Sequence, residues 1–131
     1  MTTPSGVQMV PLGQIGHLTA GEALSSTDYR FVKSSTSEDH KALACSTGEE
    51  AIGVRINSPA DDLPVDIVIL GTAKLTIGSG GCTAGDKLKS DGNAAGVTAS
   101  TTADYYCAKA LQDASEDDVI EVLLVNGFIT T

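Results

Sequence analysis

The chain has 131 residues, enough for one domain around one core, and 41% of them are hydrophobic, which argues against a disordered chain. Its 17 acidic residues exceed its 8 basic ones, and the net charge of −9 argues against nucleic-acid binding and against docking on an anionic membrane. Few aromatic residues and 14 glycines favour short strands joined by turns over long helices.

The N-terminal segment is rich in proline and glycine, which interrupt regular elements. We therefore expect residues 1–17 to form an extended arm, with one short strand in it at most. This segment shows neither a basic region nor an apolar run of signal-peptide length, so we expect synthesis in a reducing cytoplasm.

From residue 29 onward, β-branched, aromatic and aliphatic residues alternate with polar ones, which predicts strands. In chain order we expect them at Tyr29–Lys33, Lys41–Cys45, Ala51–Asn57, Val65–Leu70, Thr72–Ile77, Asp86–Ser90, Tyr105–Leu111, Val119–Val125 and Gly127–Thr130. The two most apolar of these, Val65–Leu70 and Val119–Val125, are expected at the centre of the sheet. Asp91-Gly92 is typical of a hairpin turn with both residues at positive φ. A helix is an alternative only at residues 20–25 or 101–106.

The sequence contains an internal repeat. The segment 19–26 matches 83–90 in the pattern Thr-Ala-Gly-acid-x-Leu-x-Ser, at an offset of 64 residues. The segments 52–56 and 65–70 match 107–111 and 120–125, at an offset of 55. The repeat predicts two related β units, about residues 18–71 and 82–126, that share one core. We expect Gly21, Gly85 and Gly92 to serve in structural turns.

The sequence shows no recognisable catalytic or metal-binding constellation. His17 and His40 lack a metal-ligand spacing, and nucleophile and phosphate-loop motifs are absent. The acidic pairs Asp61–Asp62 and Asp117–Asp118 fit solvated turns better than a calcium site. We therefore expect no metal, no cofactor and no enzymatic activity.

Two further groups of residues leave alternatives open. The three cysteines are few, far apart and odd in number, which favours small buried side chains, with a Cys45–Cys107 disulfide as the alternative and Cys82 left over. Asp66 and Glu121 occupy matching positions in the two most apolar strands. We expect both to face outward, with a buried pair or a subunit contact as the alternative.

The turns and strands of this chain resemble those of a known family. Four segments of the first unit are similar to the small capsid decoration, or cement, proteins of tailed bacteriophages: Leu18–Ser26, Tyr29–Lys33, Ala51–Val54 and Val65–Gly71. The segment from Thr83 to Gly92 resembles the second half of the same family. The resemblance to lambda-type head decoration proteins is looser and depends on the Ala51–Val54 strand.

The resemblance spans about residues 18–126 and implies an all-β fold of the β-tulip kind, a sandwich or partly closed barrel. Residues 1–17 would be the arm and residues 18–131 a single decoration domain. It further implies a trimer at three-fold and quasi-three-fold positions on the outer surface of the expanded phage head. Such a trimer stabilises the head against the pressure of packed DNA.

The partners implied are the major capsid protein and further copies of the chain, with neither nucleic acid nor membrane. An arm of this family lies along the capsid and adds a strand to it, which demands little of the sequence. For that contact we expect the apolar residues of the arm: Val7, Met9, Val10, Leu12 and Ile15.

Other classes of function stay open at this point. A β-clip module of the antifreeze and sialic-acid-synthase kind also uses an Ala-Gly-Glu-x-Leu turn and strand, and it would bind a small ligand as a monomer. Another kind of phage structural protein is a further alternative. An enzyme would need a convergent cluster of perturbed titratable groups, and the sequence shows none.

Overall fold

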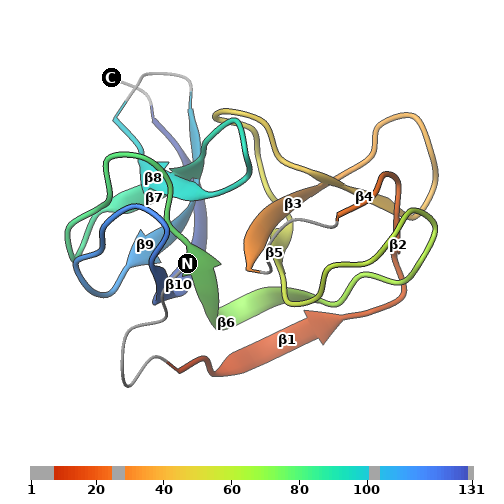
Figure 1. Cartoon of the computed structure of the whole chain (residues 1–131), viewed down its shortest axis with the longest axis horizontal. Helices are drawn as coiled ribbons and strands as arrows, with labels where there is room; N and C mark the ends of the chain where they lie inside the picture. Colours follow the sequence, from red (N-terminus) through yellow and green to blue (C-terminus); the bar gives the residue numbers. More distant parts are fainter. Residues whose placement is uncertain (1–7, 25–28, 101–103, 130–131) are drawn as a thin grey trace.

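A computed structural model gives the structure of this chain and describes residues 8–24, 29–100 and 104–129. These residues form ten strands and contain no helix, so the all-β prediction is confirmed (Figure 1). The strands are β1 Pro11–Ile15, β2 Thr19–Ala20, β3 Arg30–Ser34, β4 Lys41–Ala44, β5 Gly53–Arg55, β6 Ile67–Thr76, β7 Lys87–Ser90, β8 Gly96–Thr98, β9 Tyr105–Ala110 and β10 Val119–Phe128.

The strands form one mixed sheet that does not close into a barrel. Its order is β2-β4-β3-β5-β6-β10-β9-β7-β8, and β1 pairs separately with β6. The β2–β4 pair is parallel, and the other strand pairs are antiparallel. Strand β6 joins two lobes, one built from β2 to β5 and the other from β7 to β10 (Figure 1). The lobes pack over a shared core, and the fold is an all-β sandwich.

Two pairs of expected strands are single long strands in the structure. The segments predicted at 65–70 and 72–77 are one ten-residue strand, β6, which passes through Gly71 without a loop. Gly71 has a φ of +93°, a conformation that glycine adopts without steric cost, so the chain changes direction inside the strand. Likewise β10 continues through an irregularity between Leu124 and Gly127 instead of ending at Val125. A glycine between two apolar runs therefore marks a bend here and not a turn.

The two lobes are copies of one β unit. In the first, three residues lie side by side across β3, β5 and β6: Phe31, Val54 and Val68. In the second, three residues hold the same places across β7, β9 and β10: Lys87, Lys109 and Leu123. The offset is 55 residues for β5 and β6 and 56 for β3. The repeat predicted for the two late strands is confirmed, including its register.

The correspondence extends to irregular parts of the backbone and to ion pairs. Five residues other than glycine have positive φ: Tyr29, His40, Asp62, Ala94 and Asp117. His40 corresponds to Ala94 (φ 57° and 64°), and Asp62 to Asp117 (φ 68° and 70°). Tyr29 corresponds to Gly85, since each donates its N–H to the carbonyl at the end of the matching strand, Arg55 or Ala110. The ion pair Lys33–Glu49 recurs as Lys89–Asp104.

The Thr-Ala-Gly motif does not follow this duplication. Gly21 donates its N–H to the Ala42 carbonyl at 2.9 Å, and the matching bond in the second unit joins Gly78 to Gly96 at 2.8 Å. Gly21 therefore corresponds to Gly78, and the offset of 64 residues inferred from the motif is wrong. Thr, Ala and Gly are abundant in this chain, so the motif recurs without structural equivalence. The first unit comprises residues 8–70, and the second comprises residues 71–129.

The buried apolar residues form two clusters. The smaller lies within the first unit and contains Ala20, Leu24, Val32, Ala42, Val65 and Ile67. The larger spans both units, because Phe31, Val54 and Val68 of the first unit pack there with residues of the second such as Leu75 and Ile120. All five of these side chains are 0% exposed. Packing between the units, rather than within either one alone, provides most of the core.

Candidate functional site

Exposed apolar side chains gather where β1 lies on β6. Val10 and Leu12 are 56% and 73% exposed, and Ile69 and Leu70 on β6 are 41% and 56% exposed. We call these four residues the apolar surface. Single exposed leucines are ordinary, but a cluster of large apolar side chains on a small chain indicates a surface that another molecule covers.

Two glycines bring the side chains of the apolar surface together. A Cβ atom placed on Gly13 would lie 3.2 Å from the Leu70 Cβ and 3.4 Å from the Ile69 Cγ1. A Cβ atom on Gly71 would lie 3.1 Å from the Leu12 Cγ. Because neither glycine carries a side chain, β1 approaches β6 closely, and residues about 57 positions apart in sequence share one surface.

The structure separates the arm residues expected to contact a capsid. Val7 lies outside the described residues, Met9 is half-buried, and Val10 and Leu12 are exposed. Ile15 is half-buried and packs against the smaller core cluster, so it supports the fold instead of facing a partner. Residues 11–15 of the arm already pair with β6 of their own chain. They do not form an unpaired strand that waits for a partner.

The hairpin at Asp91–Gly92 forms, but with a different turn. Gly92 is not among the residues with positive φ, and Ala94 takes the left-handed conformation instead. The Asp91 carboxylate accepts the N–H groups of Asn93 (2.8 Å) and Ala95 (3.0 Å). The turn spans five residues between β7 and β8, and the aspartate side chain, not glycine, organises it. Gly85, in contrast, has a φ of +90°.

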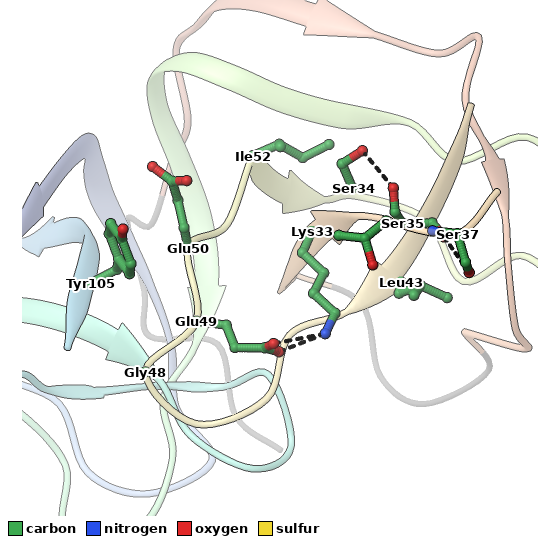
Figure 2. A pocket seen from close by; sticks show the side chains of 11 residues that line it. Lys33, Ser34, Ser35, Ser37, Leu43, Gly48, Glu49, Glu50, Ile52 and Tyr105 are labelled. Carbon is green, nitrogen blue, oxygen red and sulfur yellow. Dashed lines mark hydrogen bonds and ion pairs between the residues drawn. The ribbon is translucent and has the colours of Figure 1, made fainter. Parts of the chain in front are cut away.

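A groove of about 620 Å³ opens beside β3, β4 and β5 of the first unit (Figure 2). It is lined by Lys33, Leu43, Glu49, Glu50, Ile52, Tyr105 and the hydroxyl-rich run Ser34–Ser37, with Gly48 between them. Lys33 Nζ binds both oxygens of Glu49, at 2.7 and 2.9 Å. That hydrogen bond, together with the Ser46 N–H, holds the pKa of the Glu49 carboxyl below its usual value. Glu49 is thus neutralised in place, whereas Glu50 is exposed to solvent.

The remaining candidate residues do not converge. The His17 and His40 rings stand edge to face at 6.3 Å. Among the described residues no three His, Cys, Asp or Glu side chains are placed to hold a metal ion. Asp66 and Glu121 are half-buried at corresponding positions, and Glu121 lies opposite Lys74 across the β6–β10 pair.

The three cysteines are free thiols in three different settings. Cys45 and Cys107 are buried in the larger core cluster, and Cys82 is half-buried. Burial raises the pKa of Cys45 to about 12 and that of Cys82 to about 11, and it also raises the pKa of Cys107. Each thiol is therefore protonated and unreactive near neutral pH.

Thiol labelling should follow this order of burial. At pH 8 we expect a disulfide-exchange reagent to label Cys82 slowly in the folded protein and to reach Cys45 and Cys107 only after unfolding. A count of three thiols in denaturant and at most one in buffer is the expected result. Because folding raises these pKa values, their contribution to stability is present below pH 9 and is lost as the pH rises toward 12. A count of one thiol in denaturant would instead indicate a Cys45–Cys107 disulfide.

No protein-family model matches the chain, and no curated protein matches it in sequence. Among the described residues, no helix has the length and apolar character needed to cross a membrane.

Proposed function

We propose that the chain is a capsid decoration protein that binds the outer surface of the expanded phage head and stabilises it against the pressure of packed DNA. It would act as a trimer at three-fold and quasi-three-fold sites, beside the major capsid protein. The observation that carries the proposal is the apolar surface, formed by Val10 and Leu12 of the arm with Ile69 and Leu70. It lies in the segment that the family resemblance assigns to the capsid.

The physical demands of this role agree with the structure. A cement has no reaction to catalyse and must bury apolar area on its partner, at roughly 25 cal/mol per Å². Several modest contacts per trimer would add up to tight binding, because the second and third contacts form within one assembly. The net charge of −9 disfavours binding to DNA, which would compete with the capsid for the protein.

The contact we propose differs from strand addition by a loose arm. Strand β1 is held by β6, so the arm presents side chains to a partner while its backbone pairs with its own sheet. Removing the whole arm would therefore also remove a strand from the fold. Substitutions at exposed positions of the apolar surface test the contact without that effect.

The test is co-sedimentation of the purified protein with undecorated expanded heads and with unexpanded proheads. We expect pelleting with expanded heads only, saturation at a fixed ratio, and a gain in the heat resistance of the heads. The variant Leu12→Asp/Leu70→Asp should bind at least tenfold more weakly, since two exposed leucines lose about 1 kcal/mol or more each of apolar contact.

Leu63→Asp is the matched control for this experiment. Leu63 is 52% exposed and lies outside the apolar surface, and its counterpart in the second unit is an acid, Asp118. We expect it to bind heads like the unmodified protein. Protein that stays in the supernatant with both head forms would refute the cement function. Equal binding by the Leu12/Leu70 variant would refute the contact.

A further inference from the structure

The duplication shows what one face of the β unit is for. In the first unit, Phe31, Val54 and Val68 stand side by side across three strands, and each is 0% exposed because the second unit covers them. We call this three-residue position the ladder face. Within the chain, the ladder face of one unit is the surface on which the other unit packs.

The ladder face of the second unit has no such cover. Lys87 and Lys109 are exposed there, and Leu123 is 36% exposed. The two lysines are direct cross-strand partners, an arrangement that costs stability because like charges repel. Among the described residues, no carboxylate forms an ion pair with either lysine. Lys87 Nζ lies only 4.9 Å above the ring centre of Tyr106. In a chain with 8 basic residues, two of them share this one face.

The second unit receives the first through a defined set of groups. The Ala94 carbonyl accepts the Phe31 N–H at 2.9 Å, and the Ser90 carbonyl accepts the Gly48 N–H at 3.0 Å. Tyr105 and Cys107 complete the set. Tyr105 donates its N–H to the Gly48 carbonyl at 3.1 Å, and the Cys107 Sγ accepts the Ala51 N–H at 3.3 Å. We call Ser90, Ala94, Tyr105 and Cys107 the receiving face.

In the first unit the counterpart of the receiving face is open. By the correspondence of the strands, its members are Ser34, His40, Glu50 and Ile52. Three of these four line the 620 Å³ groove shown in Figure 2. Its acidic character is local: Glu50 is exposed, and the exposed residues Glu38 and Asp39 directly precede His40. The groove thus lies where the second unit, at the matching place, is filled by a ladder face.

We propose that a second copy of this chain fills the groove. The ladder face of the second unit in one copy would dock on the open receiving face of the first unit in the next, repeating between chains the contact that the two units make within one. Charge complementarity supports this occupant, because Lys87 and Lys109 would meet the carboxylates of Glu38 and Glu50. The contact also relieves the repulsion between the paired lysines.

Such a contact is head-to-tail, and head-to-tail contacts close into rings when the rotation allows. Three copies would contribute six units to one ring. This inference rests on the proposed function for its setting, a trimeric cement, but the contact itself is a property of the protein alone. Its test therefore uses purified protein without heads.

The experiment measures mass by light scattering after size-exclusion chromatography, over a range of protein concentrations. The unmodified chain should self-associate to a defined oligomer, and Lys87→Glu/Lys109→Glu should shift its dissociation constant at least 100-fold or leave a monomer. The variant keeps two like charges opposite each other, so its thermal unfolding should match that of the unmodified monomer. Adding Glu38→Lys and Glu50→Lys to the same chain should restore the oligomer by exchanging the charges of both faces.

Three results would overturn the contact: an unmodified chain that is monomeric at every concentration, a Lys87/Lys109 variant with unchanged oligomeric mass, or no recovery in the fourfold variant. The head-binding test fails independently. A chain that forms the charge-dependent oligomer but does not bind heads refutes the cement function and keeps the contact. A chain that binds heads but shows no charge-dependent oligomer refutes the contact alone.

Discussion

Replacing Phe31 with alanine is expected to lower the free energy of unfolding by about 3–5 kcal/mol, the usual cost of removing a fully buried aromatic ring. Phe31 is 0% exposed and sits in the larger core cluster, where the first unit packs on the second. Its loss leaves a cavity between two sheets that β6 already ties together, so the units have little freedom to close it. For a domain of this size the loss is a large part of the total stability.

The control is the corresponding position of the second unit. Lys87 occupies the same place on the same face but is exposed, so Lys87→Ala should change the free energy of unfolding by no more than about 0.5 kcal/mol. Urea unfolding followed by far-ultraviolet circular dichroism measures both variants. Equal destabilisation by the two substitutions would show that the units do not use this face as the structure indicates.

Gly53→Ala is expected to destabilise the protein by about 1–3 kcal/mol, the usual cost of overpacking a close-packed core. A glycine-to-alanine change in a strand normally stabilises, since alanine has fewer unfolded conformations. Here the new Cβ would collide with the Val68 carbonyl oxygen and lie 2.8 Å from the Ile67 Cγ2. Strand β5 lies between β3 and β6, so it cannot move away from one neighbour without losing pairing to the other.

Gly92→Ala is the matched control. Gly92 does not have positive φ, and the nearest atom to a Cβ placed there is the Thr47 Oγ1, at 3.6 Å. We expect this substitution to be neutral or to stabilise by up to about 1 kcal/mol. Chemical denaturation of both variants, compared at equal m-value, gives the two values. A Gly53→Ala protein as stable as the unmodified one would contradict the close approach of β5 and β6.

The sequence predicted most strands because period-two alternation marks one buried face, and this signal is local. Strands β3, β4, β7 and β9 lie within a residue or two of their predicted positions. Strands β2 and β8 are too short to show a period and went unpredicted. Gly71 broke the pattern of β6 into two, because a bend and a turn have the same glycine signature.

The candidate site was predictable only in part. Val10 and Leu12 stand out in the sequence as apolar residues in a segment rich in glycine and proline. Their partners on the apolar surface, Ile69 and Leu70, belong to a run that looks like a buried central strand. That run is long enough to extend past the core, and only the tertiary fold shows which of its residues are left outside.

The buried Arg55 is a further residue that sequence patterns do not foresee. An arginine between two apolar residues of a strand normally faces solvent, yet Arg55 is 1% exposed. Its Nη1 donates to the Asn57 carbonyl at 2.9 Å and to the Ser58 Oγ at 3.0 Å. Groups from the following turn supply these acceptors, so its burial depends on how the chain folds back.

Taken by itself, the sequence determined the all-β class, the acidic charge and the existence of two related β units. Composition and alternation are properties of single residues and their near neighbours, and they suffice for these conclusions. Only the tertiary structure decided how the units correspond and which faces remain uncovered. In one unit the ladder face carries Phe31, Val54 and Val68, and in the other it carries two lysines and a leucine. Backbone pairing preserves that equivalence where the side chains have diverged, and side chains are all that a sequence shows.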